Sequence, residues 1–173
     1  MKRTDSVAGV ILVLGGTRSG KSTVAEGLVA DLASQADGTV TYVATASVTD
    51  EEMARRIAAH QARRPTTWRT VELASSAELP AVLAHLDGSV LVDSLGTWVA
   101  SASDLDVDAQ ALVHALKVRS GSTVLVSEEV GLAVHPATAV GRAFVDALGH
   151  LNQTVAAMAE RVLLVVAGRA LEL

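Results

Sequence analysis

Eight residues near the amino terminus have the types and the spacing that bind phosphate. Gly15 is followed by four residues and then by Gly20-Lys21-Ser22, which satisfies the pattern G-x-x-x-x-G-K-[ST]. Glycines let successive backbone N–H groups point at phosphate oxygens, the lysine reaches the β- and γ-phosphates, and the Ser22 hydroxyl can bind Mg²⁺. The predicted nucleotide-binding residues here are Gly15, Gly16, Thr17, Arg18, Ser19, Gly20, Lys21 and Ser22.

A carboxylate follows a later apolar segment in the manner of a Walker B acid. Ser89-Val90-Leu91-Val92 runs directly into Asp93. A carboxylate at such a strand end can hold Mg²⁺ directly or through water. We therefore predict Ser22 and Asp93 as the metal ligands and Asp93 as a nucleotide-site residue. The alternative is that Asp93 only caps a turn.

His60 is the histidine with the most suggestive surroundings. On a helix expected over residues 49–64 it shares a face with Ile57, while arginines lie one turn before it, at Arg56, and after it, at Arg63 and Arg64. Neighbouring cations disfavour a protonated imidazole, and a neutral imidazole is a nucleophile. The arginines could hold phosphate oxygens. This arrangement suggests a covalent histidine–nucleotide intermediate, and the alternative is a histidine that merely packs.

The elements that must position these residues alternate along the chain. Short, mostly apolar strands are expected at 7–14, 39–45, 68–72, 89–93, 122–127 and 161–167, and helices at 21–34, 49–64, 77–86, 104–117 and 139–159. Such alternation predicts an α/β fold of the P-loop NTPase type, with three layers, a mostly parallel sheet and helices on both faces. Ligands of such folds bind at the carboxyl ends of the strands.

Length and composition bound the remaining possibilities. The chain has 173 residues, half of them apolar but only 2% aromatic, which suits one core of aliphatic strands and helices. We expect a disordered lead over residues 1–6 and a single nucleotide-binding domain over residues 7–173. The absence of cysteine excludes disulfides and thiolate metal sites, and no apolar run approaches a membrane span. We expect a cytoplasmic protein.

Charge is unevenly distributed along the chain. The formal net charge of −5 argues against non-specific nucleic-acid binding. Residues 53–71 contain five arginines and no acid, whereas residues 70–116 contain seven acids and no lysine or arginine. Two interpretations stay open: differently solvated faces, or a basic patch for a small polyanion beside an acidic, metal-binding region.

Two other classes of nucleotide-binding protein compete with a nucleotidyltransferase. A switch GTPase would read guanine with N-K-x-D, which is absent here because Asn152 is the only asparagine. A nucleotide-dependent regulatory module is therefore disfavoured. A small-metabolite or nucleoside-monophosphate kinase without a covalent intermediate remains the enzymatic alternative, with the arginines of residues 55–69 closing over the transferred phosphate.

Several stretches together resemble one family. They are residues 15–22, Tyr42-Val43-Ala44-Thr45-Ala46, Asp50-Glu51-Glu52-Met53, Arg56-Ile57 with His60, Arg64-Pro65, residues 68–72, Leu91-Val92-Asp93-Ser94-Leu95, Glu129-Val130-Gly131 and Asn152-Gln153. The chain resembles the bifunctional adenosylcobinamide kinase/adenosylcobinamide-phosphate guanylyltransferases of cobalamin biosynthesis over residues 9–168. One departure is Glu128, which stands where the family often has asparagine.

The resemblance implies two reactions. ATP or GTP phosphorylates adenosylcobinamide, and GTP then transfers GMP, through a guanylylated histidine matched here by His60, to adenosylcobinamide phosphate. The resemblance also implies a homo-oligomer that could be a trimer, and GTP contacts beyond the phosphate loop. The implied contacts are Ala46, Ser47 and Val48, together with Glu72 and Asp93.

Overall fold

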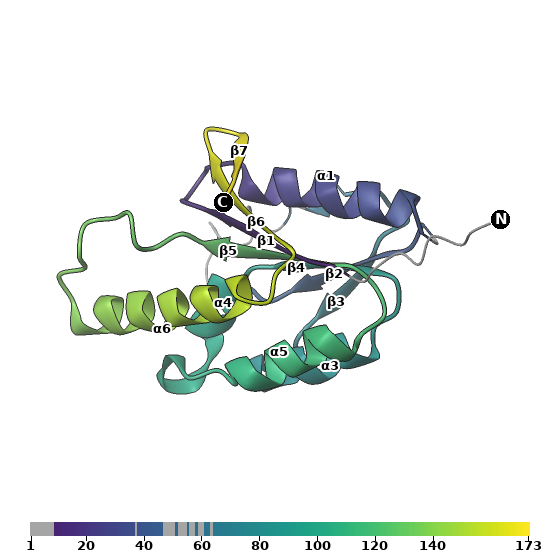
Figure 1. Ribbon diagram of the computed structural model, residues 1–173. Coiled ribbons are helices and arrows are strands. Elements are labelled where there is room, and N and C mark those ends of the chain that lie inside the picture. Colours follow the sequence, from purple (N-terminus) through teal and green to yellow (C-terminus); the bar gives the residue numbers. More distant parts are fainter. Residues whose placement is uncertain are drawn as a thin grey trace.

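A single seven-stranded sheet organises the computed structural model, which describes residues 9–36, 38–46, 51, 55, 58, 61–62 and 64–173 (Figure 1). Its strand order is β3-β2-β4-β5-β1-β6-β7. The strands are β1 (Val10–Gly15), β2 (Val40–Ala44), β3 (Arg69–Glu72), β4 (Ser89–Asp93), β5 (Thr123–Glu128), β6 (Arg161–Val166) and β7 (Arg169–Glu172).

Every pairing in this sheet is parallel except the last, between β6 and β7. The chain reverses between them at Ala167 and Gly168, whose φ angles are 51° and 76°. β7 was not predicted, because it has only four residues, all exposed, and therefore no alternation of buried and exposed positions.

Helices cover both faces of the sheet, as predicted (Figure 1). α1 (Lys21–Ser34) lies on one face, and the other carries α3 (Leu79–His85), α4 (Leu95–Ser101), α5 (Ala109–Val118) and α6 (Ala139–Ala156). Two short 3-10 turns accompany them: η1 (Ser76–Glu78) directly precedes α3, and η2 (Ser103–Leu105) lies between α4 and α5. The α/β fold of the P-loop type is confirmed.

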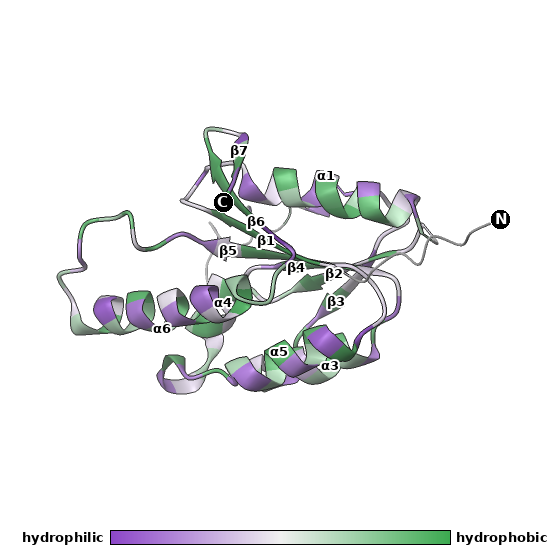
Figure 2. Cartoon of the chain, in the orientation of Figure 1, coloured by the Kyte–Doolittle hydropathy of each residue, from purple (hydrophilic) through white to green (hydrophobic). Residues whose placement is uncertain are grey.

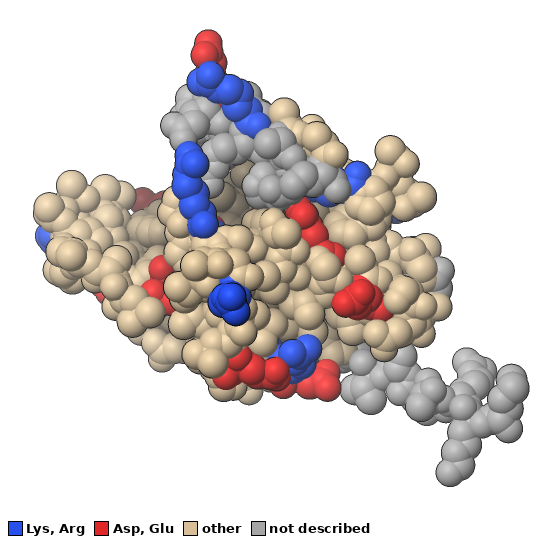
Figure 3. Space-filling model, turned by 90° about the horizontal axis from the view of Figure 1, so that it is seen from above, with Lys and Arg blue, Asp and Glu red and all other residues tan. Residues whose placement is uncertain are grey.

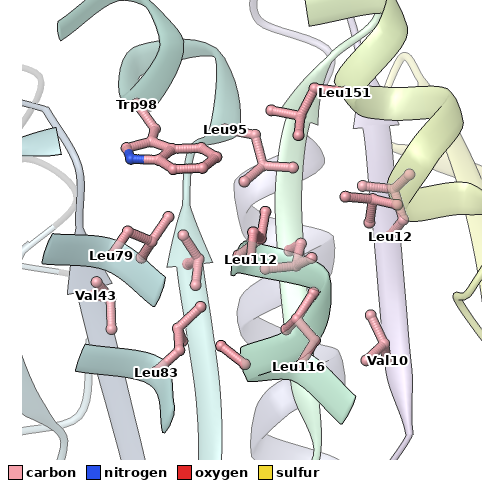
Figure 4. Packing of buried hydrophobic residues seen from close by; sticks show 14 of the residues in the cluster. Val10, Leu12, Val43, Leu79, Leu83, Leu95, Trp98, Leu112, Leu116 and Leu151 are labelled. Carbon is pink, nitrogen blue, oxygen red and sulfur yellow. The ribbon is translucent and has the colours of Figure 1, made fainter. Parts of the chain in front are cut away.

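The core forms two apolar layers, one on each face of the sheet. Figure 2 shows the strands as the most continuously hydrophobic part of the molecule. Ala25, Val29 and Ala33 of α1 pack on one face. On the other, Leu79, Leu95, Trp98, Leu112 and Leu151 come together from four helices (Figure 4). This packing anchors α1, the helix that the phosphate loop precedes, on the sheet.

The main differences from the predicted elements concern three helices. The helix expected over 104–117 begins at Ala109, with Asp108 capping it, because Asp104 and Leu105 have positive φ angles of 54° and 59°. The acids therefore precede the helix. α4 was not predicted, and the helix expected to reach residue 159 ends at Ala156. The predicted lead over 1–6 and most of the predicted helix over 49–64 lie outside the described residues.

The surface and the helices add two further observations. On the face that carries α1 and the β6–β7 hairpin, charges of both signs are scattered among uncharged residues (Figure 3). Among the described residues, none of the helices has the length and apolar character that crossing a membrane requires.

Candidate nucleotide-binding site

The phosphate loop joins β1 to α1 and is held by close backbone packing. A Cβ atom on Gly15 would lie 2.5 Å from the Ser19 hydroxyl and 2.8 Å from the Val165 carbonyl oxygen, so glycine is required there. Gly20 has a φ of 91°, which other residues rarely adopt. The Gly168 N–H donates to the Ser19 carbonyl at 2.7 Å, so the β6–β7 turn supports the loop from one side.

Lys21 is the first residue of α1 and turns back over this loop. Its Nζ donates to the Gly16 carbonyl at 3.4 Å and lies 3.5 Å from the Oε1 atom of Glu128. Its side chain is only 12% exposed. The ammonium therefore sits above the loop, where a triphosphate would be held, and faces a carboxylate.

Glu128 ends β5, the strand between the phosphate-loop strand β1 and the strand of Asp93, β4. The Ser94 hydroxyl lies 3.1 Å from each of its carboxylate oxygens. The main-chain carbonyl of Glu128 accepts a hydrogen bond from the Asn152 side-chain amide at 3.0 Å. A Cβ on Gly96 would lie 1.8 Å from its Oε2, so glycine makes the space for this carboxylate.

Asp93 lies at the carboxyl end of β4 and is oriented by Tyr42. The Tyr42 hydroxyl donates to Oδ2 of Asp93 at 3.1 Å, and the Arg64 guanidinium stacks on the Tyr42 ring, 3.2 Å from its centroid. Burial, followed by the negative charge of Asp93, raises the pKa of Tyr42. The phenol therefore stays protonated and remains a donor to Asp93.

Thr45 and Ser94 fix the backbone beyond Asp93. The Thr45 hydroxyl accepts from the Ser94 N–H at 2.8 Å and donates to the Ser94 carbonyl at 2.6 Å. The Ser94 hydroxyl in turn caps α4 by accepting from the Thr97 N–H. One serine thus holds the start of a helix and the Glu128 carboxylate together.

The structure brings many of the predicted residues to one edge of the sheet. Gly15, Asp93 and Glu72 end strands there, and Ala46 follows β2 by two residues. Glu72 is exposed at the end of β3, separated from Asp93 by β2. The predicted residues His60, Ser47, Val48 and Arg63 lie outside the described part of the chain. Arg55, in the arginine-rich stretch, is exposed and 4.0 Å from Glu51.

Sequence reasoning assigned no structural role to the residues that hold the site together. They are Tyr42, Thr45, Ser94, Gly96, Glu128 and Asn152. The available signal was a pair of acids, Glu128-Glu129, after an apolar strand. In the structure Glu129 caps its own loop, accepting from the Gly131 and Leu132 N–H groups at 2.7 and 3.0 Å, and only Glu128 faces Lys21.

Fold and site together define an α/β nucleotide-binding protein with a phosphate loop. Solved structures with this fold include the flagellar accessory protein FlaH from Methanocaldococcus jannaschii (TM-score 0.54, 14% identity, 95% of this chain and 75% of that one). The KaiC-like protein PH0186 from Pyrococcus horikoshii is similar to the same extent (TM-score 0.51, 14% identity, 91% and 71%). At such identities the likeness concerns the fold alone.

The family follows from the sequence comparisons. Residues 11–173 match the family described as cobinamide kinase/cobinamide phosphate guanyltransferase. The chain is 43% identical to the bifunctional adenosylcobalamin biosynthesis protein CobP of Pseudomonas aeruginosa, over 91% of this chain and 92% of that protein. It is 36% identical to the protein CobU of Salmonella typhimurium, over 92% and 96%. The chain therefore belongs to the cobinamide kinase/cobinamide phosphate guanyltransferase family and is an enzyme.

Proposed function

We propose that this chain catalyses two transfers. It phosphorylates adenosylcobinamide with ATP or GTP, and it moves GMP from GTP, through a guanylylated His60, to adenosylcobinamide phosphate. The observation that carries the proposal is Lys21 in a phosphate loop, at the same sheet edge as Asp93 and Glu128, in a chain of this family.

The two transfers differ in the phosphorus atom that is attacked. In the first, the acceptor hydroxyl bonds to the γ-phosphorus and the nucleoside diphosphate leaves. In the second, an imidazole nitrogen of His60 bonds to the α-phosphorus and pyrophosphate leaves. A phosphate oxygen of adenosylcobinamide phosphate then displaces the histidine, giving adenosylcobinamide-GDP. Lys21 and the loop N–H groups would hold the triphosphate in both.

Mg²⁺ fits the polar groups that this edge offers. A hydroxyl from Ser22 and a carboxylate from Asp93 are the kinds of ligand that Mg²⁺ takes from a protein when phosphate oxygens and waters complete its shell. No cluster of three or more His, Cys, Asp or Glu side chains suited to a metal occurs among the described residues, and nucleotide-bound Mg²⁺ requires none. When bound, the ion would neutralise charge on the phosphate oxygens.

The test is covalent labelling with GTP that carries ³²P at the α-phosphorus, in the presence of Mg²⁺. A bond between a His60 nitrogen and the α-phosphorus is a phosphoramidate, so the label on the protein should survive alkali and be lost in acid. His60→Ala should abolish the label, and His114→Ala, which changes an exposed histidine of α5, should retain it. Full labelling of His60→Ala would disprove the histidine assignment, and phosphoryl transfer without any labelling would favour a kinase without a covalent intermediate.

A further inference from the structure

Glu128 is the carboxylate nearest the phosphate-loop lysine among the described contacts, and the proposed transfers leave it without a role. We propose that Glu128 is a positioning residue: it holds the Lys21 ammonium where the β- and γ-phosphates bind. The inference rests on the proposed function.

The lysine needs such a partner because its side chain is long and flexible. A lysine has four rotatable bonds and loses considerable side-chain entropy when it is fixed. Lys21 Nζ has two described contacts, the Gly16 carbonyl at 3.4 Å and Glu128 Oε1 at 3.5 Å. The carbonyl belongs to the loop itself, so Glu128 is the contact that reaches Lys21 from outside the loop. Protein kinases likewise need a lysine–glutamate ion pair in place to contact phosphates.

The carboxylate can direct Lys21 because it is itself held. The Ser94 hydroxyl lies 3.1 Å from both carboxylate oxygens, and Ser94 is fixed in turn by Thr45. The Glu128 carbonyl is held by Asn152, which also accepts from the Ser127 hydroxyl at 2.6 Å. The side chain of Glu128 is 29% exposed, so it is neither buried as a purely structural charge nor free in solvent.

Gly96 offers a way to move this carboxylate without removing it. A Cβ at position 96 would lie 1.8 Å from Oε2 and 2.8 Å from Cδ of Glu128, both at the end of a flexible side chain. Gly96→Ala should therefore displace the carboxylate while the chain still folds. Gly149→Ala is the matched control, because nothing lies within 4 Å of a Cβ at that helical glycine.

The experiment measures kcat for phosphoryl transfer to adenosylcobinamide at saturating nucleotide, together with thermal melting. Glu128→Gln keeps the shape of the side chain and removes its charge. This variant and Gly96→Ala should each lower kcat about tenfold, with the melting temperature of the wild type. Glu160→Gln, the same change before β6 at the opposite edge of the sheet, should leave kcat unchanged.

A double-mutant cycle separates positioning of Lys21 from any other role. In a Lys21→Ala background, Glu128→Gln should lower kcat by less than about twofold, because the group that it positions is gone. Losses that multiply in the double variant would overturn the proposal. So would a fall in kcat that is fully explained by a lower melting temperature.

A second measurement needs no turnover. The chain has three lysines, so ¹³C-lysine labelling gives three Cε signals, and Lys21→Ala assigns one of them. That signal should move in Glu128→Gln and Gly96→Ala and stay in place in both controls. An unmoved signal overturns the proposal. A wild-type protein that transfers neither phosphate nor GMP disproves the proposed function instead, and the lysine signals still decide whether Glu128 holds Lys21.

Discussion

Opposite edges of the same sheet carry two charged clusters that are built differently. At the carboxyl edge, Lys21 and Glu128 are partners through side chains, and both are partly exposed. At the amino edge, Arg119 is 5% exposed and donates to the carbonyls of Leu86, Gly88, Gly121 and Ser122 and to the Thr123 hydroxyl. A charge held by backbone carbonyls has no partner that can move away, whereas a side-chain pair can exchange its partners for a ligand.

The difference separates a structural charge from a functional one. Gly121 lies against Gly88, and a Cβ there would be 1.8 Å from the Gly88 carbonyl oxygen, so the two loops meet with no room for another side chain. Arg119 connects these two loops at the amino ends of β4 and β5 by donating to carbonyls in both. Burial lowers the pKa of Arg119, an effect that the nearby Asp87 only partly offsets, and the guanidinium still remains charged at neutral pH.

The largest expected effect is on stability, at the amino edge. Arg119→Met should lower the free energy of unfolding by about 3 to 5 kcal/mol, because carbonyls that were paired with a cation become buried without donors. The melting midpoint, measured by circular dichroism, should fall by roughly 10 °C. Arg169→Met, at an exposed arginine of β7, is the control. A variant that melts like the wild type would show that water replaces the guanidinium without cost.

The next effect is on nucleotide handling, at the carboxyl edge. Lys21→Ala should weaken nucleotide binding or the rate of both transfers by about 1.5–3 kcal/mol, ten- to hundredfold, through loss of a charge-assisted phosphate contact. Its melting midpoint should stay close to that of the wild type, the reverse of Arg119→Met. Binding is measured by calorimetric titration with GTP and Mg²⁺. An unchanged affinity and rate would remove Lys21 from the site.

At the carboxyl edge, the residues that belong to short contiguous sequence patterns could be predicted. The phosphate loop and the strand that ends at Asp93 are contiguous patterns, so their residues could be named in advance. Glu128 could not be assigned, because the choice between it and Glu129 depends on long-range register. Glu128 pairs with Gly15 of the phosphate-loop strand, and at this end of β5 its carboxylate reaches both Lys21 of α1 and Ser94, which caps α4.

No pattern in the sequence predicted the buried Arg119 cluster at the amino edge. Arg119 follows an amphipathic helix in a position typical of a solvated residue, and it is held by the loop before β4, whose Gly88 and Leu86 are 31 and 33 residues away. α4 was missed for a related reason: it has seven residues, and its Ser94 cap and Thr97 form a box without the usual Glu or Gln. Such features depend on tertiary contacts rather than on local pattern.

A smaller effect tests how Asp93, the proposed metal ligand, is oriented. Tyr42→Phe keeps the ring under Arg64 and removes the donor to Asp93. We expect the Mg²⁺ concentration for half-maximal activity to rise about fivefold, roughly 1 kcal/mol for one hydrogen bond. Because burial and Asp93 raise the pKa of Tyr42, the effect should be constant through neutral pH. An unchanged Mg²⁺ requirement would count against Asp93 as a ligand.

The smallest expected effect tests whether an ion pair adds stability when it is not buried. Arg161 donates to Glu172 twice, at 2.9 Å each, but the pair is exposed on the edge hairpin. The hydrogen bond from Arg161 lowers the pKa of Glu172, so any stability it adds is present above the unfolded pKa and is lost as pH falls through the folded pKa. Glu172→Gln should melt like the wild type at pH 7, because exposed pairs contribute little. A large loss there would mean that pairing alone, without burial, holds an edge of this sheet, and the contrast drawn from Arg119 would not stand.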